Sequence, residues 1–145
     1  IRDSLHIVRD PFVVFPSTKR LWNSLHHVQA MQIDSEENAE EYVFKCFDTM
    51  YAAFERDRAE LKNGQLHEIR YEELVSDPVS SMEKAYKELR IDGFDKVRPA
   101  FERQAESMKG YTTNTYHHDP RIVLEIAERW QPFIERYGYK KPATD

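Results

Sequence analysis

The chain has 145 residues, 40% of them hydrophobic and 32% charged, which suits a globular domain with a core and excludes a disordered segment. Its formal net charge of −5 argues against a general nucleic-acid-binding surface, and no apolar run approaches the ~20 residues of a membrane span. The single cysteine, Cys46, cannot form an internal disulfide. It is compatible with a reducing compartment, and we expect a cytoplasmic protein.

The first predicted element is a short strand over residues 5–8, and a helix follows from Pro11 to about Val28. Asp10 is a suitable N-cap for this helix, and Pro11 suits its first position, where a missing N–H costs nothing. We expect Pro16 to bend the early part of the helix or to force a local break.

A long second helix is predicted from about residue 38 to about Leu61, where Asn63 and Gly64 end it. Apolar residues recur in it at three- and four-residue steps, which predicts a buried stripe. Cys46 belongs to this stripe, so we expect a buried, inert thiol. The members of the stripe are Tyr42, Val43, Cys46, Phe47, Met50, Tyr51 and Phe54.

The second half of the chain contains one more predicted strand, over residues 65–71. A helix should open at Asp77-Pro78, with Val79, Met82, Ala85, Tyr86 and Leu89 on its apolar face. A short helix over 99–108 and a loop over 109–118 follow. The last helix should open at Asp119-Pro120, kink at Pro132 and end at Gly138, with an inward face made of Ile122, Val123, Ile126, Trp130, Phe133 and Tyr137.

Two strands joined through helices should pair in parallel. A two-stranded parallel sheet has two open edges and little core, so it is a poor folding unit by itself. We therefore expect an α/β fold of which this chain is the helix-rich C-terminal part, with further strands upstream of Ile1.

The junction of the first strand and the first helix has the features of an anion site. A helix N-terminus offers free amides and a partial positive charge, and Arg9 adds a fixed cation with a fork geometry suited to phosphate. Ser17 follows about two helical turns later. A phosphate beside those turns can meet both side chains, although an Arg-Asp-Pro sequence at such a turn is also a common structural cap.

Three segments resemble sulfotransferases that use 3′-phosphoadenosine 5′-phosphosulfate (PAPS). Arg9-Asp-Pro-Phe-Val-Val-Phe-Pro-Ser17 is similar to the segment with which that family binds the 3′-phosphate of PAPS. Arg70-Tyr-Glu-Glu-Leu-Val-Ser-Asp-Pro78 resembles the block that follows the next core strand of the family. The tail, residues 111–116 and 128–139, is similar to the C-terminal end of bacterial members. The three matches occur in the family's order and span nearly the whole chain.

The resemblance implies a parallel sheet like that of the P-loop kinases, with residues 1–145 forming one partial domain. It implies that PAPS is the co-substrate, that no metal is needed, and that Arg9 and Ser17 contact the 3′-phosphate. Tyr71 matches the tyrosine that approaches the adenine, or it is a core aromatic. Lys109-Gly110 matches part of an Arg-Lys-Gly that holds the 3′-phosphate, or Lys109 is an exposed loop residue, since Met108 replaces the arginine.

No glycine-rich phosphate loop is recognisable among the four scattered glycines, and no catalytic base is assigned. By the resemblance, both lie upstream of Ile1, and this fragment alone should be inactive. The six histidines lack the spacing of a structural zinc site.

The resemblance implies that the acceptor is a hydroxyl or amine of a small molecule, carbohydrate, lipid or protein. We expect no nucleic-acid partner, and the sequence leaves the oligomeric state open. The alternatives are a nucleotide-binding P-loop kinase relative and a non-catalytic helical interaction module.

Overall fold

The computed structural model describes residues 3–29, 36–110, 116 and 119–143. The chain divides into two compact units. The first comprises residues 1–9 and 57–114, and the second comprises residues 10–56 and 115–145. Of the predicted loop over 109–118, the structure describes residues 109, 110 and 116, and the rest lies outside the described residues.

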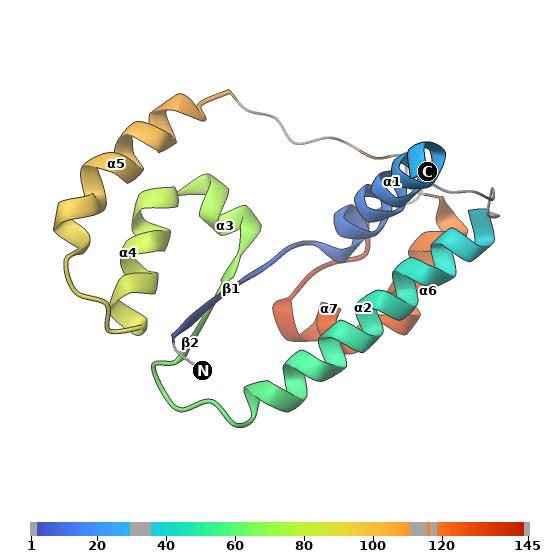
Figure 1. The fold of residues 1–145 in the computed structure, drawn as a ribbon, viewed down its shortest axis with the longest axis horizontal. Helices are drawn as coiled ribbons and strands as arrows, with labels where there is room; N and C mark the ends of the chain where they lie inside the picture. The colour runs from blue at the N-terminus through green and yellow to red at the C-terminus, as the bar shows by residue number, and fades with distance from the viewer. Residues whose placement is uncertain (1–2, 30–35, 111–115, 117–118, 144–145) are drawn as a thin grey trace. The chain divides into compact units, whose positions relative to one another are not determined.

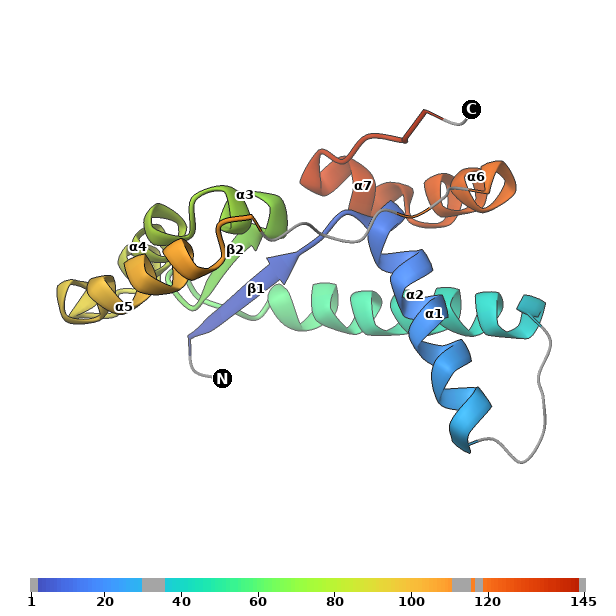
Figure 2. The same cartoon turned by 90° about the horizontal axis from the view of Figure 1, so that it is seen from above.

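The first unit is built on two strands, β1 (Ser4–Val8) and β2 (Leu66–Arg70), followed by α3 (Tyr71–Ser76), α4 (Pro78–Glu88) and α5 (Phe94–Ser107). The strands pair in parallel, with Ser4 opposite Leu66 and Val8 opposite Arg70. Figures 1 and 2 both show them side by side. The predicted parallel pairing is confirmed, and both carboxyl ends lie at one edge of the sheet.

The core of the first unit joins the sheet to α4 and α5. Its buried residues come from both strands and both helices: Val8, Ile69, Ala85, Leu89 and Phe94. The predicted face of α4 is confirmed at Ala85 and Leu89. The predicted start of α5 at Pro99 is wrong, because the helix begins at Phe94. Phe94 packs edge-on against Tyr86, with ring centroids 5.1 Å apart, and this buried contact anchors an extra turn that Pro99 does not prevent.

The second unit consists of α1 (Pro11–Gln29), α2 (Glu36–Arg58, whose last two residues belong to the first unit), α6 (Pro120–Arg129) and α7 (Gln131–Tyr137). Figure 2 shows α1 crossing α2. Aromatic and branched side chains from α1, α2 and α6, together with the residue after α6, form its core: Phe12, Phe15, Val43, Phe44, Val123, Ile126 and Trp130. Trp22 packs at the margin of this cluster.

The buried face of α2 differs from the predicted stripe. Phe44, absent from that stripe, is completely buried, whereas Met50 is 63% exposed. Cys46 is also exposed, so the expectation of a buried thiol is wrong. The apolar residues of α2 cover more of its circumference than the core can bury, and the packing of α1 and Trp130 selects the side that contains Phe44 and Phe47.

Prolines act differently in the two ends of the second unit. α1 runs through Pro16 as one helix, so the local break that we expected as one of two possible effects of this proline does not occur. The last predicted helix is interrupted at Trp130, so that α6 and α7 are separate and Pro132 lies in the first turn of α7. Proline is tolerated in a first turn because its missing N–H has no helical partner there. Gly138 ends α7 with φ of 67°, as predicted.

All three Asp-Pro sequences are confirmed as helix starts. The Asp10, Asp77 and Asp119 carboxylates accept hydrogen bonds from the backbone N–H of Phe12 (2.8 Å), Ser80 (3.2 Å) and Arg121 (2.8 Å). The short helix α3 was not predicted; it occupies the end of the expected strand and the turn before Asp77. Among the helices of the described residues, none has the length and apolarity to cross a bilayer.

A buried carboxylate ties three helices of the second unit together. Glu40 on α2 is only 7% exposed. One of its oxygens accepts a hydrogen bond from Lys19 on α1 (2.8 Å), and the other accepts one from Arg121 on α6 (2.7 Å). Burial by itself raises the pKa of Glu40, but the hydrogen bonds from Arg121 and Lys19 outweigh burial and hold its pKa below the ordinary value of 4.5.

We predict that Glu40→Gln lowers the free energy of unfolding by about 1–2 kcal/mol, because two cations lose their shared carboxylate. The folded-state pKa of Glu40 is depressed, so its contribution is complete above 4.5 and is lost as the pH falls through the folded pKa. Urea titrations at several pH values should therefore show wild type and variant converging in acid. Glu128→Gln, at an exposed position of α6, is the control; an equal loss there would contradict the assignment.

Candidate functional site

Two of the sequence-predicted site residues lie at the carboxyl end of the sheet. Arg9 directly follows β1, and Tyr71 directly follows β2. Because Val8 stands opposite Arg70 in the parallel register, the next residue of each strand emerges at the same edge. In open α/β sheets, ligands bind beyond the carboxyl ends of the strands. This edge is therefore the part of the first unit where we place the candidate site.

The Arg9 guanidinium lies over the Tyr71 ring, with its central carbon 4.3 Å from the ring centroid. Both residues are half-buried. A cation–π contact uses the flat face of the guanidinium, whereas its five N–H donors point outward in the plane of the group. The aromatic ring thus orients Arg9 without using the donors that recognise a phosphate or carboxylate.

The residues after Arg9 begin the second unit with a well-defined helix start. The backbone carbonyl of Asp10 accepts hydrogen bonds from the N–H groups of Val13 (3.0 Å) and Val14 (2.9 Å). Pro11 is fully buried, and the first turn of α1 carries no acidic side chain. The acidic group at this helix start is the N-cap carboxylate of Asp10, which accepts a hydrogen bond from the Phe12 N–H and partly compensates the positive end of the α1 dipole.

The other residues predicted to contact the nucleotide lie in two different parts of the chain. Ser17 lies half-buried on α1, in the second unit. Lys109 is exposed just beyond α5 and pairs with Glu106, one turn earlier in the chain. Gly110 has φ of +89°, and an added Cβ would meet no atom within 4 Å. The contacts of Ser17, Lys109 and Gly110 with a nucleotide remain predictions.

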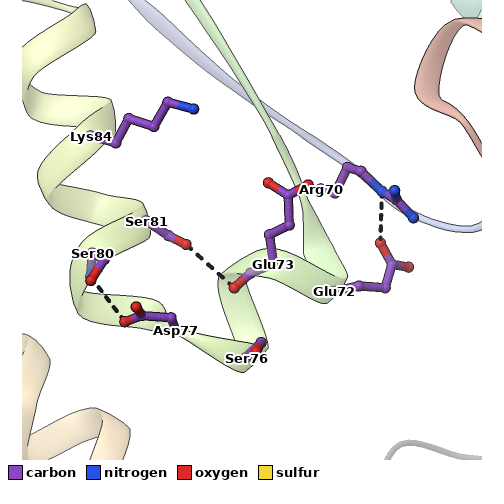
Figure 3. A pocket seen from close by; sticks show the side chains of 8 residues that line it. All are labelled: Arg70, Glu72, Glu73, Ser76, Asp77, Ser80, Ser81 and Lys84. Carbon is purple, nitrogen blue, oxygen red and sulfur yellow. Dashed lines mark hydrogen bonds and ion pairs between the residues drawn. The ribbon is translucent and has the colours of Figure 1, made fainter.

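A surface hollow of ≈ 520 Å³ lies beside the end of β2 (Figure 3). It is lined by Arg70, Glu72, Glu73, Ser76, Asp77, Ser80, Ser81 and Lys84. Arg70 pairs with Glu72 at 3.8 Å, and the Ser81 hydroxyl donates to the carbonyl of Glu73 at 3.3 Å. Figure 3 shows Lys84 extending from α4 toward the side on which Glu73 lies. Three acidic and two basic side chains line this hollow, so its charge favours neither a cation nor an anion.

The described parts of the chain contain no candidate metal site. No group of three or more histidine, cysteine, aspartate or glutamate side chains there is arranged to hold an ion. His6 illustrates the alternative use of such residues, because its Nδ1 lies 3.2 Å from Glu68 across the two strands. The same glutamate also pairs with Arg58.

Comparison with known proteins matches residues 4–96 to the sulfotransferase family. The match includes both strands, Arg9, the start of α1 and Tyr71. The chain belongs to the sulfotransferase family. Membership places the Arg9–Tyr71 pair in the family's matched region, whereas Lys109 and Gly110 lie beyond it.

Two sulfotransferase relatives are similar to almost the whole chain. Both are named omega-hydroxy-beta-dihydromenaquinone-9 sulfotransferase Stf3, one from Mycobacterium bovis and the other from Mycobacterium tuberculosis. Each is 28% identical over 137 residues, which is 94% of this chain and 35% of the relative. The chain thus spans about a third of the length of these relatives. No solved structure matches significantly.

Sequence reasoning found Arg9 and Tyr71 separately but not their contact. The available signal was that each follows a predicted strand and that the strands were expected to pair in parallel. It missed the hollow beside β2, because Ser80, Ser81 and Lys84 look like ordinary solvent-facing residues of α4 until the turn at Asp77 folds them toward α3.

We predict that Asp10→Ala lowers the free energy of unfolding by about 1 kcal/mol, since the variant loses the cap of α1. Urea denaturation followed by circular dichroism measures the change. Asp92→Ala removes an exposed aspartate from the bend before α5 and is the matched control. Equal effects of the two substitutions would show that Asp10 contributes only its charge.

Proposed function

We propose that the chain binds PAPS through its 3′-phosphate and that the protein transfers the sulfuryl group to an acceptor. Membership in the sulfotransferase family supports the reaction class. The observation that carries the nucleotide contact is the Arg9 guanidinium held over Tyr71 at the carboxyl ends of two parallel strands. An arginine oriented through its face, with its N–H fork available, suits a bidentate phosphate contact.

In this proposal each residue has one task. Arg9 donates a charge-assisted pair of hydrogen bonds to the 3′-phosphate, and the Ser17 hydroxyl donates a further one. Amides at the start of α1 add a favourable field. Tyr71 offers the ring face opposite Arg9 to the adenine, and Lys109 with Gly110 adds to the phosphate contacts. Reading the 3′-phosphate distinguishes PAPS from nucleotides such as ATP that lack it.

The reaction itself is a transfer between two oxygens or from oxygen to nitrogen. An acceptor hydroxyl or amine attacks the sulfur of PAPS, the bond from sulfur to the 5′-phosphate oxygen breaks, and 3′,5′-adenosine bisphosphate leaves. A base takes the acceptor proton, and cationic donors stabilise the charge that develops on the leaving oxygen. We assign neither that base nor the cradle for the 5′-phosphosulfate to any of these 145 residues.

The acceptor class that we propose is a hydroxyl carried by a lipid-like molecule. The two mycobacterial relatives are named for an omega-hydroxylated dihydromenaquinone, which is an apolar molecule with a terminal alcohol. We also propose that the two strands belong to a P-loop kinase-like sheet within one partial sulfotransferase domain, and that the protein acts in the cytoplasm.

We expect Arg9→Ala to weaken binding of 3′,5′-adenosine bisphosphate about 10- to 150-fold, the equivalent of about 1.5–3 kcal/mol for a charged hydrogen bond. Calorimetric titration of the chain measures this effect. Binding of 5′-AMP, which lacks the 3′-phosphate, should change little. Arg103→Ala, at an exposed position of α5, is the matched control and should bind like wild type. Unchanged affinity in Arg9→Ala would remove Arg9 from the site.

We expect Tyr71→Leu to weaken binding of both 3′,5′-adenosine bisphosphate and 5′-AMP, since both carry the adenine that the ring would stack on. The bisphosphate should lose more, since the ring also orients Arg9. Loss of one base–aromatic contact corresponds to about 1–3 kcal/mol. Tyr71→Phe keeps the ring and should bind nearly as well as wild type. Calorimetry with both nucleotides tests this. A loss confined to the bisphosphate would instead mean that Tyr71 acts only by orienting Arg9.

A further inference from the structure

A second hollow of the first unit lies at the opposite end of β2 from Tyr71. It has a volume of ≈ 530 Å³ and is formed by the last turn of α2, the connection to β2 and the end of α4. Five strand residues at about 3.3 Å each place roughly 16 Å between the two ends of β2. Its lining residues are Arg58, Leu61, Lys62, Asn63, Gly64, Leu66, Lys87, Glu88 and Arg90.

The lining is strongly basic for a chain of net charge −5. Four cations, Arg58, Lys62, Lys87 and Arg90, face one acidic side chain, Glu88. Arg58 is partly neutralised by Glu68, to which its guanidinium donates. Among the residues that the structure describes, the other three cations take part in no ion pair. Like charges that share a concave surface repel one another, and a bound anion relieves that repulsion.

The backbone at this hollow is unusual at two positions. Arg90 has φ of 55°, and it is the one non-glycine residue with positive φ in the described chain. It follows α4 where a helix commonly ends on glycine, and the N–H of Ile91 donates back to the carbonyl of Tyr86 at 2.8 Å. The left-handed conformation is unfavourable for a residue with a Cβ, because the Cβ comes too close to the following carbonyl oxygen. A strained arginine in place of glycine points to a use for its side chain.

Gly64, in the connection before β2, lines the same hollow and lies beside Arg90. It also has positive φ, of 86°, and a Cβ built on it would come within 3.4 Å of the Arg90 Nε. The positive φ is what favours glycine at this position, and the contact distance places the Arg90 side chain beside the connection before β2. The two backbone conformations together hold a guanidinium at the wall of a basic hollow.

We propose that this hollow, defined by Lys62, Gly64, Lys87 and Arg90, binds a phosphate group. Arg90 supplies a planar fork and the two lysines supply point charges, which is the donor set that a doubly charged oxyanion takes. The phosphate belongs either to a soluble molecule or to the headgroup of an anionic lipid, and the experiment below separates the two sources. The proposal does not depend on sulfuryl transfer.

The test follows the amide signals of the 145-residue chain by NMR while inorganic phosphate replaces chloride at constant ionic strength. We expect saturable shifts at residues 62–64 and 87–90. Any shifts at Arg9 and Tyr71 report separately on the nucleotide site. Constant ionic strength matters, because exposed charges are screened over about 10 Å at 0.1 M salt.

Two variants test the assigned cations. Arg90→Gly removes the guanidinium while supplying the residue that the backbone conformation favours, so the fold should be kept or stabilised. We expect it to weaken phosphate binding about tenfold or more, and Lys87→Gln to weaken it by several-fold, as for charged hydrogen bonds. Arg103→Gln makes the same change of charge at an exposed position of α5 and should bind like wild type.

Vesicle flotation identifies the source of the phosphate. Vesicles of phosphatidylcholine mixed with phosphatidylglycerol should retain the chain, and lose it in Arg90→Gly, if the ligand is a lipid headgroup; phosphatidylcholine alone is the control. Phosphate binding without flotation supports a soluble ligand. The proposal is overturned if neither probe binds at residues 62–64 and 87–90, or if Arg103→Gln weakens binding as much as Arg90→Gly.

Discussion

The parallel pairing of β1 with β2 is the interaction on which the candidate site depends. It sets Val8 opposite Arg70, and that register brings Arg9 and Tyr71 out at the same edge of the sheet, where the guanidinium lies over the aromatic ring. A shift of the register by one residue would turn the side chains of one strand to the other face and separate the pair. The far end of β2 borders the basic hollow, which is lined by the connection before this strand and by the end of α4. The two proposed anion contacts of the first unit thus lie beyond opposite ends of β2.

In the second unit, side-chain packing and a buried carboxylate hold α1 in place. An aromatic cluster centred on Phe44 and Trp130 supplies apolar burial, and Glu40 adds directional hydrogen bonds from Lys19 and Arg121. A buried carboxylate with a single partner would be costly, but one with two cationic partners satisfies both of its oxygens. Asp10 then fixes where α1 starts. This helix carries Ser17, so the packing of the second unit determines how rigidly a predicted phosphate contact is presented.

Several features could be predicted from local sequence rules. Others could not, because they depend on which of several apolar side chains the packing partners bury. The Asp-Pro helix starts and the end of α7 at Gly138 followed from short-range rules, and the structure confirms them. The parallel strand pair followed from the helical connection between the strands, and it is confirmed as well. The buried side of α2 was harder, because its apolar residues exceed what one face can bury and the choice between Phe44 and Met50 belongs to the packing partners. The early start of α5 likewise depends on Phe94 meeting Tyr86. In the site, Arg9 and Tyr71 were each recognisable, but their contact and the basic hollow combine residues distant in the chain.

The sequence by itself determined the three Asp-Pro helix starts, the parallel strand pair, the membership of the family and the identity of Arg9 and Tyr71 as candidate contacts. The helix starts and the motifs follow from capping and residue spacing over a few positions, and the parallel pairing follows from the helical connection between the two strands. Only the tertiary structure decided which side of α2 is buried, that Cys46 is exposed, that one carboxylate serves three helices, and that Lys62, Lys87 and Arg90 share one hollow. Such features depend on burial and on the meeting of charges far apart in the chain, and no local pattern encodes either of them.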